Sequence, residues 1–138
     1  MPIPHRTDLP PVLTAADLGD RWRLLATIDP PPARGAELRV QVFDADGRQG
    51  SALIVVEDVP PRPDGSFVEN LLTLLGHVVD DDTAGIGSVA FALVRAEPED
   101  VQPADLSWAG ELLEGCRRRG TRARGVHLVG AGSLTPLG

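Results

Sequence analysis

The feature that most constrains the fold is a run of six consecutive apolar residues, Val89–Val94. The run is too short to cross a membrane as a helix, and Gly87 and Arg95 bound it. A strand that is apolar on both sides must be covered on both faces of its sheet. We therefore expect Val89–Val94 to be the central strand of a sheet.

Two stretches with helical periodicity flank this strand. In the first, apolar residues recur at helical spacing over 68–79, and Ser66 and Glu69 have the form of a capping box at its start. The second has Pro103 in its first turn and is predicted to end at Gly120. Its apolar stripe comprises Leu106, Ala109, Leu112, Leu113 and Cys116. Both stretches predict amphipathic helices that cover a sheet.

Further strands are predicted before and after these helices. Apolar and polar residues alternate over 37–42, and the apolar stretch 53–56 is expected to return beside it as a more central strand. The stretches 126–129 and 134–137 predict a closing pair of short strands. Near the N-terminus, a T-x-x-D capping box at Thr14 predicts a short helix that runs into an apolar strand.

The elements together predict an α/β domain with three layers, α-β-α. In this arrangement a mixed sheet lies between the helix that begins near Ser66 and the helix that contains Asp105. A chain of 138 residues fits one domain, because two smaller domains would each bury too small a core. We assign the proline-rich residues 1–13 to a flexible tail and residues 14–138 to a single domain.

Composition narrows the classes of partner. A net charge of -7 argues against binding to nucleic acid or to an anionic membrane surface. Cys116 is the only cysteine, so the chain can form neither an intrachain disulfide nor a C-x-x-C metal site. The first residues have no apolar stretch typical of a signal peptide or a membrane span. These features predict a cytoplasmic protein.

No common catalytic motif is present in the sequence. The nucleophile elbow G-x-S-x-G, the phosphate loop G-K-[ST] and the zinc helix H-E-x-x-H are all missing. The histidines His5, His77 and His127 show no metal-ligand spacing, so we assign structural roles to them, such as capping of a helix end by His77. Cys116 falls in a helical apolar stripe, where a thiol packs as a small core residue. We predict no catalytic residue and no cofactor from these motifs.

A cluster of arginines is the one strongly basic feature. It comprises Arg117, Arg118, Arg119, Arg122 and Arg124. Cations at the end of a helix interact favourably with its dipole, which is the interpretation we favour. The alternative is a binding patch for an acidic partner, for a second copy of the chain or for nucleic acid. The absence of interleaved aromatic residues argues against nucleic acid.

A sequence pattern in the second half of the chain resembles a known family. The buried strand is followed by Arg95-Ala96-Glu97-Pro98, and Gln102-Pro103-Ala104-Asp105 opens the next helix. This layout resembles the JAB/MPN metalloprotease fold, which is cytidine-deaminase-like, and within it the RadC-type branch. That branch has H-x-H-P after the strand and S-x-x-D at the start of the helix. With the upstream hairpin and helix, the resemblance covers residues 37–137.

The resemblance implies a degenerate metal site. In active members two histidines and the aspartate hold zinc, which activates a water molecule. Here Arg95 and Glu97 occupy the histidine positions and Asp105 the aspartate position. Arginine cannot ligate zinc, because its guanidinium stays protonated and offers only donors. The resemblance therefore implies a domain without bound metal that is not an enzyme.

We predict that Arg95 replaces the charge of the metal by pairing with Asp105 or Glu97. The alternative is that Arg95 ends a strand at the surface and that Asp105 merely favours the first turn of its helix. The chain also resembles short actinobacterial proteins, rich in arginine and proline, that share an F-x-D-A-D-G-R hairpin and a PADLxWA-like helix start. This second resemblance supports a fold and implies no reaction.

Three functions follow from these patterns. The leading prediction is a non-catalytic JAB-like binding or scaffold module, with another protein or a second copy of the chain as its partner. The alternative is a metal-dependent hydrolase with an altered site built from Glu97, Asp105 and His127. The third is binding of an acidic partner or nucleic acid through residues Arg117–Arg124, which predicts strong salt dependence.

Overall fold

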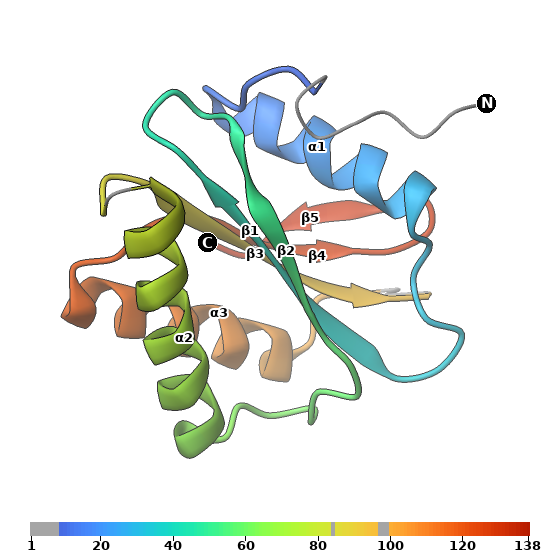
Figure 1. The fold of residues 1–138 in the computed structure, drawn as a ribbon. Coiled ribbons are helices and arrows are strands. Elements are labelled where there is room, and N and C mark those ends of the chain that lie inside the picture. Colours follow the sequence, from blue (N-terminus) through green and yellow to red (C-terminus); the bar gives the residue numbers. More distant parts are fainter. Residues whose placement is uncertain (1–8, 84, 97–99) are drawn as a thin grey trace.

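A computed structural model of the chain describes residues 9–83, 85–96 and 100–138. In chain order the elements are α1 (Ala15–Ile28), β1 (Ala36–Phe43), β2 (Gln49–Val56), α2 (Gly65–Thr83), β3 (Ser88–Arg95), α3 (Pro103–Arg119), β4 (Arg122–Val129) and β5 (Leu134–Pro136). The strands form one sheet in the order β2-β1-β3-β4-β5 (Figure 1). Strands β3 and β4 are parallel, and the other neighbouring pairs are antiparallel. The described residues therefore form a mixed α/β fold.

Strand β3 lies at the centre of the sheet, as its apolar run predicts. It pairs with β1 on one side and with β4 on the other, and every residue from Ser88 to Val94 is buried. Successive side chains point to opposite faces. The larger ones, Val89, Phe91 and Leu93, join the core beneath α2 and α3, while Ala90, Ala92 and Val94 face α1. Two alanines on the α1 face leave room for the buried Trp22.

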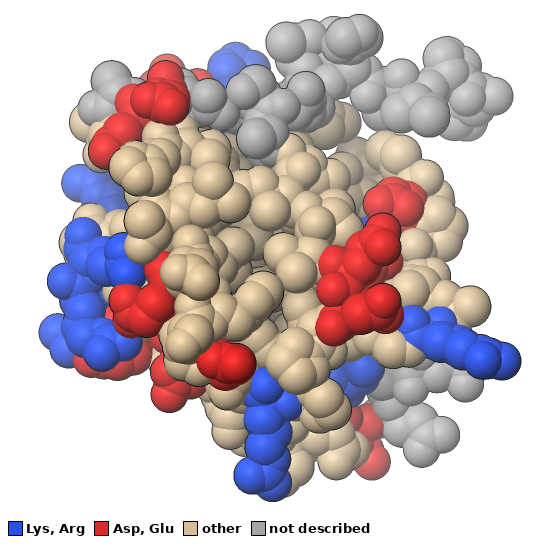
Figure 2. Space-filling view, turned by 60° about the horizontal axis from the view of Figure 1, so that its bottom comes forward, with Lys and Arg blue, Asp and Glu red and all other residues tan. Residues whose placement is uncertain are grey.

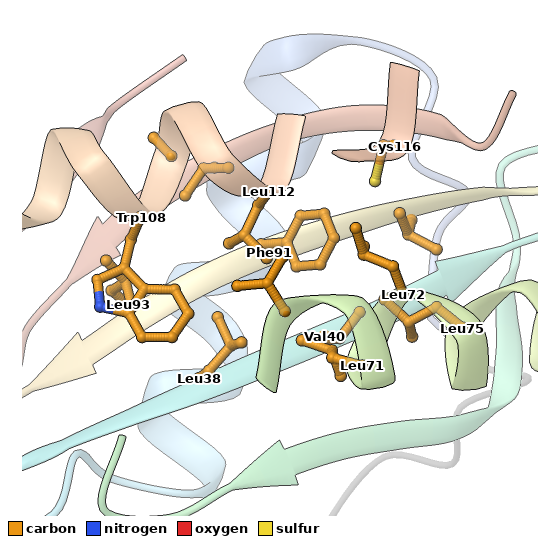
Figure 3. Packing of buried hydrophobic residues seen from close by; sticks show 14 of the residues in the cluster. Leu38, Val40, Leu71, Leu72, Leu75, Phe91, Leu93, Trp108, Leu112 and Cys116 are labelled. Atoms are coloured by element: carbon orange, nitrogen blue, oxygen red, sulfur yellow. The ribbon is translucent and has the colours of Figure 1, made fainter. Parts of the chain in front are cut away.

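The prediction that the sheet lies between α2 and α3 is wrong. These two helices lie on the same face, where Leu72 of α2 and Leu112 of α3 share a core cluster with Phe91 (Figure 3). Helix α1 covers the opposite face through Leu18 and Trp22 (Figure 1). The layers are therefore α1, the sheet, and the pair α2 and α3. The apolar stripe of α1 supplies the cover that the second face of β3 requires.

Helix α1 is longer than predicted, and the apolar strand expected directly after it does not form. The predicted capping box is confirmed, because the Asp17 N–H donates to the Thr14 hydroxyl and the Asp17 carboxylate accepts from the Thr14 N–H, both at 3.1 Å. Leu24 and Leu25 continue the helix instead of starting a strand. Leu25 packs against Trp22 and its neighbours, so helical spacing decides the conformation here.

Part of the predicted tail packs against the domain. Residues 1–8 lie outside the described residues, but Leu9 and Val12 are buried. The Val12 N–H donates to the Gly47 carbonyl oxygen at 2.7 Å. The guanidinium groups of Arg21 and Arg124 donate to carbonyl oxygens of the same segment. Residues 9–12 are thus held by the hairpin, by α1 and by β4.

Strand β2 lies at the edge of the sheet, whereas its apolar sequence predicts a more central position. The predicted hairpin with β1 is confirmed, with Val40 opposite Ile54. Among its side chains, Leu53 and Ile54 are half-buried and Val55 is exposed. The strand is apolar although, within the described chain, it pairs with only one other strand, β1.

Helix α2 is capped by Asp64 instead of Ser66. The Asp64 carboxylate accepts from the Ser66 N–H at 2.8 Å, and the Asp64 carbonyl accepts from the Val68 N–H at 2.9 Å. An aspartate at this position is a favoured cap. Glu69, the expected partner of Ser66, instead forms ion pairs with the end of α3.

Candidate functional site

The end of β3 and the beginning of α3 come together at one place in the fold. Strand β3 ends at Arg95, and α3 begins at Pro103. Helix α3 then leads into β4, which runs parallel to β3. A crossover of this kind places the start of the helix near the carboxyl end of the first strand. In open α/β sheets, ligands bind outside the carboxyl ends of the strands.

Arg95 and Asp105 form a two-pronged ion pair at this place. The two terminal guanidinium nitrogens of Arg95 donate to the two carboxylate oxygens of Asp105, the second at 3.1 Å. The Asp105 side chain is 3% exposed and that of Arg95 is 27% exposed. The predicted pairing of Arg95 with Asp105 is confirmed, so Arg95 does not simply end its strand in solvent. Glu97, the other predicted partner, lies outside the described residues.

Asp105 is held in its charged form. It accepts a third hydrogen bond, from the Gln102 N–H at 2.8 Å, which also satisfies a free donor at the start of α3. Burial by itself raises the pKa of this carboxyl group. The hydrogen bonds from Arg95 and Gln102 and the charge of Arg95 outweigh that effect, so the pKa of Asp105 lies below its ordinary value of 3.8.

A cavity of about 490 Å³ opens beside this ion pair. Its lining comprises Gly35, Ala36, Val59, Pro60, Pro61, Leu93, Arg95, Gln102, Ala104, Asp105 and Trp108. One wall is fixed by Trp108, whose indole N–H donates to the Pro60 carbonyl oxygen at 3.1 Å. Phe67 and Trp108 pack in a T-shaped arrangement, with 5.8 Å between the ring centroids and an angle of 86° between the planes. The cavity is therefore a largely apolar, preformed cleft with one charged end.

The chemistry of this cleft does not suit a metal ion. Zinc needs lone pairs from nitrogen, sulfur or oxygen, and the guanidinium of Arg95 has none to give. Both oxygens of Asp105 are already hydrogen-bonded. Over 9–83, 85–96 and 100–138, no three side chains of His, Cys, Asp or Glu are grouped as metal ligands. The donors present instead suit a ligand that offers hydrogen-bond acceptors.

His127 lies on the other face of the sheet from Asp105. In β4 its neighbours Val126 and Leu128 belong to the core beneath α2 and α3, so His127 faces α1. Its side chain is buried, and its Nδ1 has no hydrogen-bond partner in the described part of the chain. The structure therefore does not bring Asp105 and His127 together as the altered metal site requires, and Glu97 falls outside the described residues.

We expect His127 to make the protein less stable in mild acid. Burial lowers the pKa of its imidazole below the ordinary value of 6.5. The unfolded chain then takes up a proton first, so the contribution of His127 is complete above pH 6.5 and is lost as the pH falls through the lower pKa of the folded state. Urea unfolding across this range should show a weaker pH dependence for His127→Leu than for the wild type. Parallel curves for the two proteins would contradict this prediction.

Cys116 is a packing residue, as predicted. Its side chain is buried in the core between α3 and the sheet, beside Leu72 and Leu112 (Figure 3). Burial raises the pKa of the thiol to about 11, although the charge of Arg119 opposes this change. The thiol is therefore protonated at neutral pH and is a poor nucleophile.

The arginines at the end of α3 are paired with acidic residues. Arg117 forms two hydrogen bonds with Glu114, at 2.5 and 2.8 Å. Arg118 and Arg119 both reach Glu69 on α2, at 3.7 and 2.5 Å. Figure 2 shows blue basic groups beside red acidic groups on this side of the molecule. The predicted patch is thus largely neutralised, and its arginines tie α2 to α3.

The remaining two arginines of the cluster lie on β4 and not on the helix. Arg124 donates to the Ser88 hydroxyl at 2.8 Å and to the Val12 carbonyl oxygen, and its guanidinium lies 5.2 Å from the centroid of the Phe43 ring. It is therefore a structural residue that holds the N-terminal segment. Arg122 is exposed at the start of β4. The five arginines do not form one binding surface.

The other two predicted histidine positions do not join the cleft. His77 lies within α2, because the helix continues to Thr83, so it does not cap the helix end as predicted. The Thr83 hydroxyl performs a related task, since it donates to the Val79 carbonyl oxygen in the last turn at 2.6 Å. His77 borders a separate cavity of about 580 Å³ between α2 and the start of β4. His5 lies outside the described residues.

Sequence patterns missed the apolar wall of the cleft. Trp108 is three residues after Asp105, and residues at this spacing share one face of a helix. That spacing was a usable signal that Trp108 lies beside Asp105. Nothing comparable marks Pro60 and Val59, which reach the cleft from the loop after β2 and are distant in sequence.

Comparison with protein-family models, with curated proteins and with solved structures finds no match to this chain. Among the helices of the described segments, none has both the length and the apolarity that crossing a membrane requires.

Proposed function

We propose that this chain is a cytoplasmic, non-catalytic binding module of JAB/MPN-like layout, and that its ligand site is the cleft beside Arg95 and Asp105. The observation that carries the proposal is the position of the ion pair. Two of the three residues that the resemblance assigns to a metal site, Arg95 and Asp105, neutralise each other beside an apolar cavity. In this proposal the cleft binds a ligand through Arg95 and the apolar walls, and holds no metal.

The order of elements supports the layout. A hairpin, a helix, a buried strand, a second helix and a closing hairpin follow one another, as in the JAB/MPN resemblance. The resemblance assigns the histidine positions of that family to this strand end and its aspartate position to this helix start. The finer assignment to the RadC-type branch depends on the residues of 95–105 alone.

The cleft favours a ligand with an acceptor oxygen attached to an apolar group. Arg95 has five N–H donors, of which two go to Asp105, so donors remain for a carbonyl or carboxylate oxygen. Trp108, Pro60 and their neighbours provide apolar walls. Pockets that combine apolar walls with a few polar anchors are typical of small-molecule and side-chain recognition.

Titration with small aromatic carboxylates and amides, beginning with benzoate, tests this proposal by nuclear magnetic resonance. The chain has two tryptophans, Trp108 in the cleft and Trp22 on the opposite face of the sheet. We expect the indole signal of Trp108 to shift while that of Trp22 stays constant. Arg95→Met should abolish the effect, and Arg117→Met, which alters an exposed ion pair, should preserve it.

Metal analysis of the purified protein can contradict this proposal. Stoichiometric zinc that disappears on Asp105→Ala would overturn the non-catalytic proposal, because it would show that the aspartate still acts as a ligand. Equal shifts of both indole signals would also contradict it, since a specific ligand in the cleft cannot touch both faces of the sheet.

A further inference from the structure

The outer edge of β2 lacks the features that usually prevent an edge strand from pairing with another strand. Its eight residues, Q-G-S-A-L-I-V-V, include no charge and no proline. Natural sheets protect exposed edges with lysine, proline, bulges or very short strands. The opposite edge follows this rule, because β5 has three residues and ends at Pro136. Within the described residues, no strand pairs with the outer side of β2.

The apolar side chains of β2 are only partly covered. Val55 is 38% exposed, and Leu53, Ile54 and Val56 are half-buried. A strand added at this edge would cover these side chains and satisfy the outward backbone donors and acceptors of β2. The edge is therefore suited to pairing in a way that the rest of the sheet is not.

The charges at the two ends of β2 indicate which strand fits. Arg48 precedes the strand, and Glu57 and Asp58 follow it. All three are exposed, and none forms an ion pair in the described part of the chain. When the same strand pairs with itself antiparallel, the start of each copy lies beside the end of the other. Arg48 of one copy then meets Glu57 and Asp58 of the second at both ends.

We propose that two copies of this chain associate by antiparallel pairing of their β2 strands around a twofold axis near Leu53. The two five-stranded sheets then become one continuous sheet of both subunits. A parallel pairing would place Arg48 beside Arg48, which opposes it electrostatically. Twofold symmetry is the commonest symmetry of homo-oligomers, and it makes one surface complementary to itself.

Sedimentation velocity of the full chain over a concentration series tests the proposal. The wild type should pass from monomer to dimer as its concentration rises. Val55→Lys puts a protecting charge on the edge and should weaken the association at least about tenfold, the effect of losing roughly 1.4 kcal/mol. The matched control is Leu74→Lys on α2, where a leucine that is 49% exposed lies away from the edge. This control should dimerise like the wild type.

A charge-reversal cycle identifies the orientation of the two strands. Arg48→Glu and Glu57→Arg should each weaken the dimer, and combining the two should restore most of the affinity, because opposite charges face each other again. Circular dichroism confirms that each surface variant is folded. A wild type that stays monomeric up to its solubility limit overturns the proposal. A dimer that resists Val55→Lys, or charge reversals that do not compensate each other, would do so as well.

Discussion

Asp105→Ala should lower the free energy of unfolding at neutral pH by about 3 kcal/mol. The substitution leaves the partly buried guanidinium of Arg95 without its partner and removes the acceptor for the Gln102 N–H at the start of α3. Removing one member of a fully buried pair costs about 3–5 kcal/mol, and we expect the lower end because Arg95 can still reach water. Equilibrium unfolding in urea measures the loss.

A double-mutant cycle separates the ion pair from the helix cap. When Arg95→Met is already present, Asp105→Ala should cost only about 1 kcal/mol, because only the cap is lost. The matched control is Glu114→Ala on the same helix, whose partner Arg117 is exposed. This control should leave the stability nearly unchanged. Equal effects at Asp105 and Glu114 would contradict a structural ion pair.

The difference in unfolding free energy between the wild type and Asp105→Ala should depend on pH. The pKa of Asp105 is lower in the folded protein than its ordinary value of 3.8. The stabilising contribution is therefore complete above that value and is lost as the pH falls through the lower pKa of the folded state. The stability gap between the wild type and Asp105→Ala should close in this acidic range.

Local patterns predicted the centre of this fold well. The apolar run Val89–Val94 required cover on both faces, and that requirement alone placed β3 in the middle of the sheet. The alternation over 37–42 and the turn after it fixed the β1-β2 hairpin. These features depend on contacts between residues that are close in sequence or on the burial of one strand.

Local patterns could not predict which helices cover which face of the sheet. The faces of the sheet look alike in sequence, and nothing local states which helix covers which face. The residues that determine the layering are Trp22, Leu18 and Leu25. They form an apolar stripe on α1 when the segment is helical, and this stripe covers one face of the sheet. Interpreting Leu24 and Leu25 as a strand left α1 too short to cover a face. With α1 covering one face, α2 and α3 both lie on the other.

The candidate site shows the same limit. The pairing of Arg95 with Asp105 was predictable, because a short loop joins the end of its strand to the start of the next helix and keeps the two ends close together. The dispersal of the arginine cluster was not predictable. Whether Arg119 faces an acidic residue depends on how α2 and α3 pack. Their packing brings Glu69, fifty residues earlier in the chain, beside Arg119. Arginines close in sequence need not have the same partners: Arg119 pairs with Glu69 of α2, whereas Arg124 donates to Ser88 and to the N-terminal segment.

Trp108→Ala should be the most destabilising single change among the residues of the cleft, at about 3–5 kcal/mol. The side chain is 1% exposed and packs in the core beneath α2 and α3 (Figure 3). It also packs in a T-shaped arrangement with Phe67 and donates a hydrogen bond to the Pro60 carbonyl oxygen. Truncation leaves a cavity that the neighbouring strands can close only in part. It also leaves the loop after β2 without its anchor on α3.

Leu106→Ala provides the matched control for this prediction. Leu106 lies on the same helix but is 54% exposed, so its truncation should change the free energy of unfolding by no more than about 0.5 kcal/mol. Trp108→Phe keeps a ring in the core and should remain folded. Unfolding in urea separates the cases. If Trp108→Ala cost no more than Leu106→Ala, the cleft would not have the rigid wall on which specific binding beside Arg95 depends.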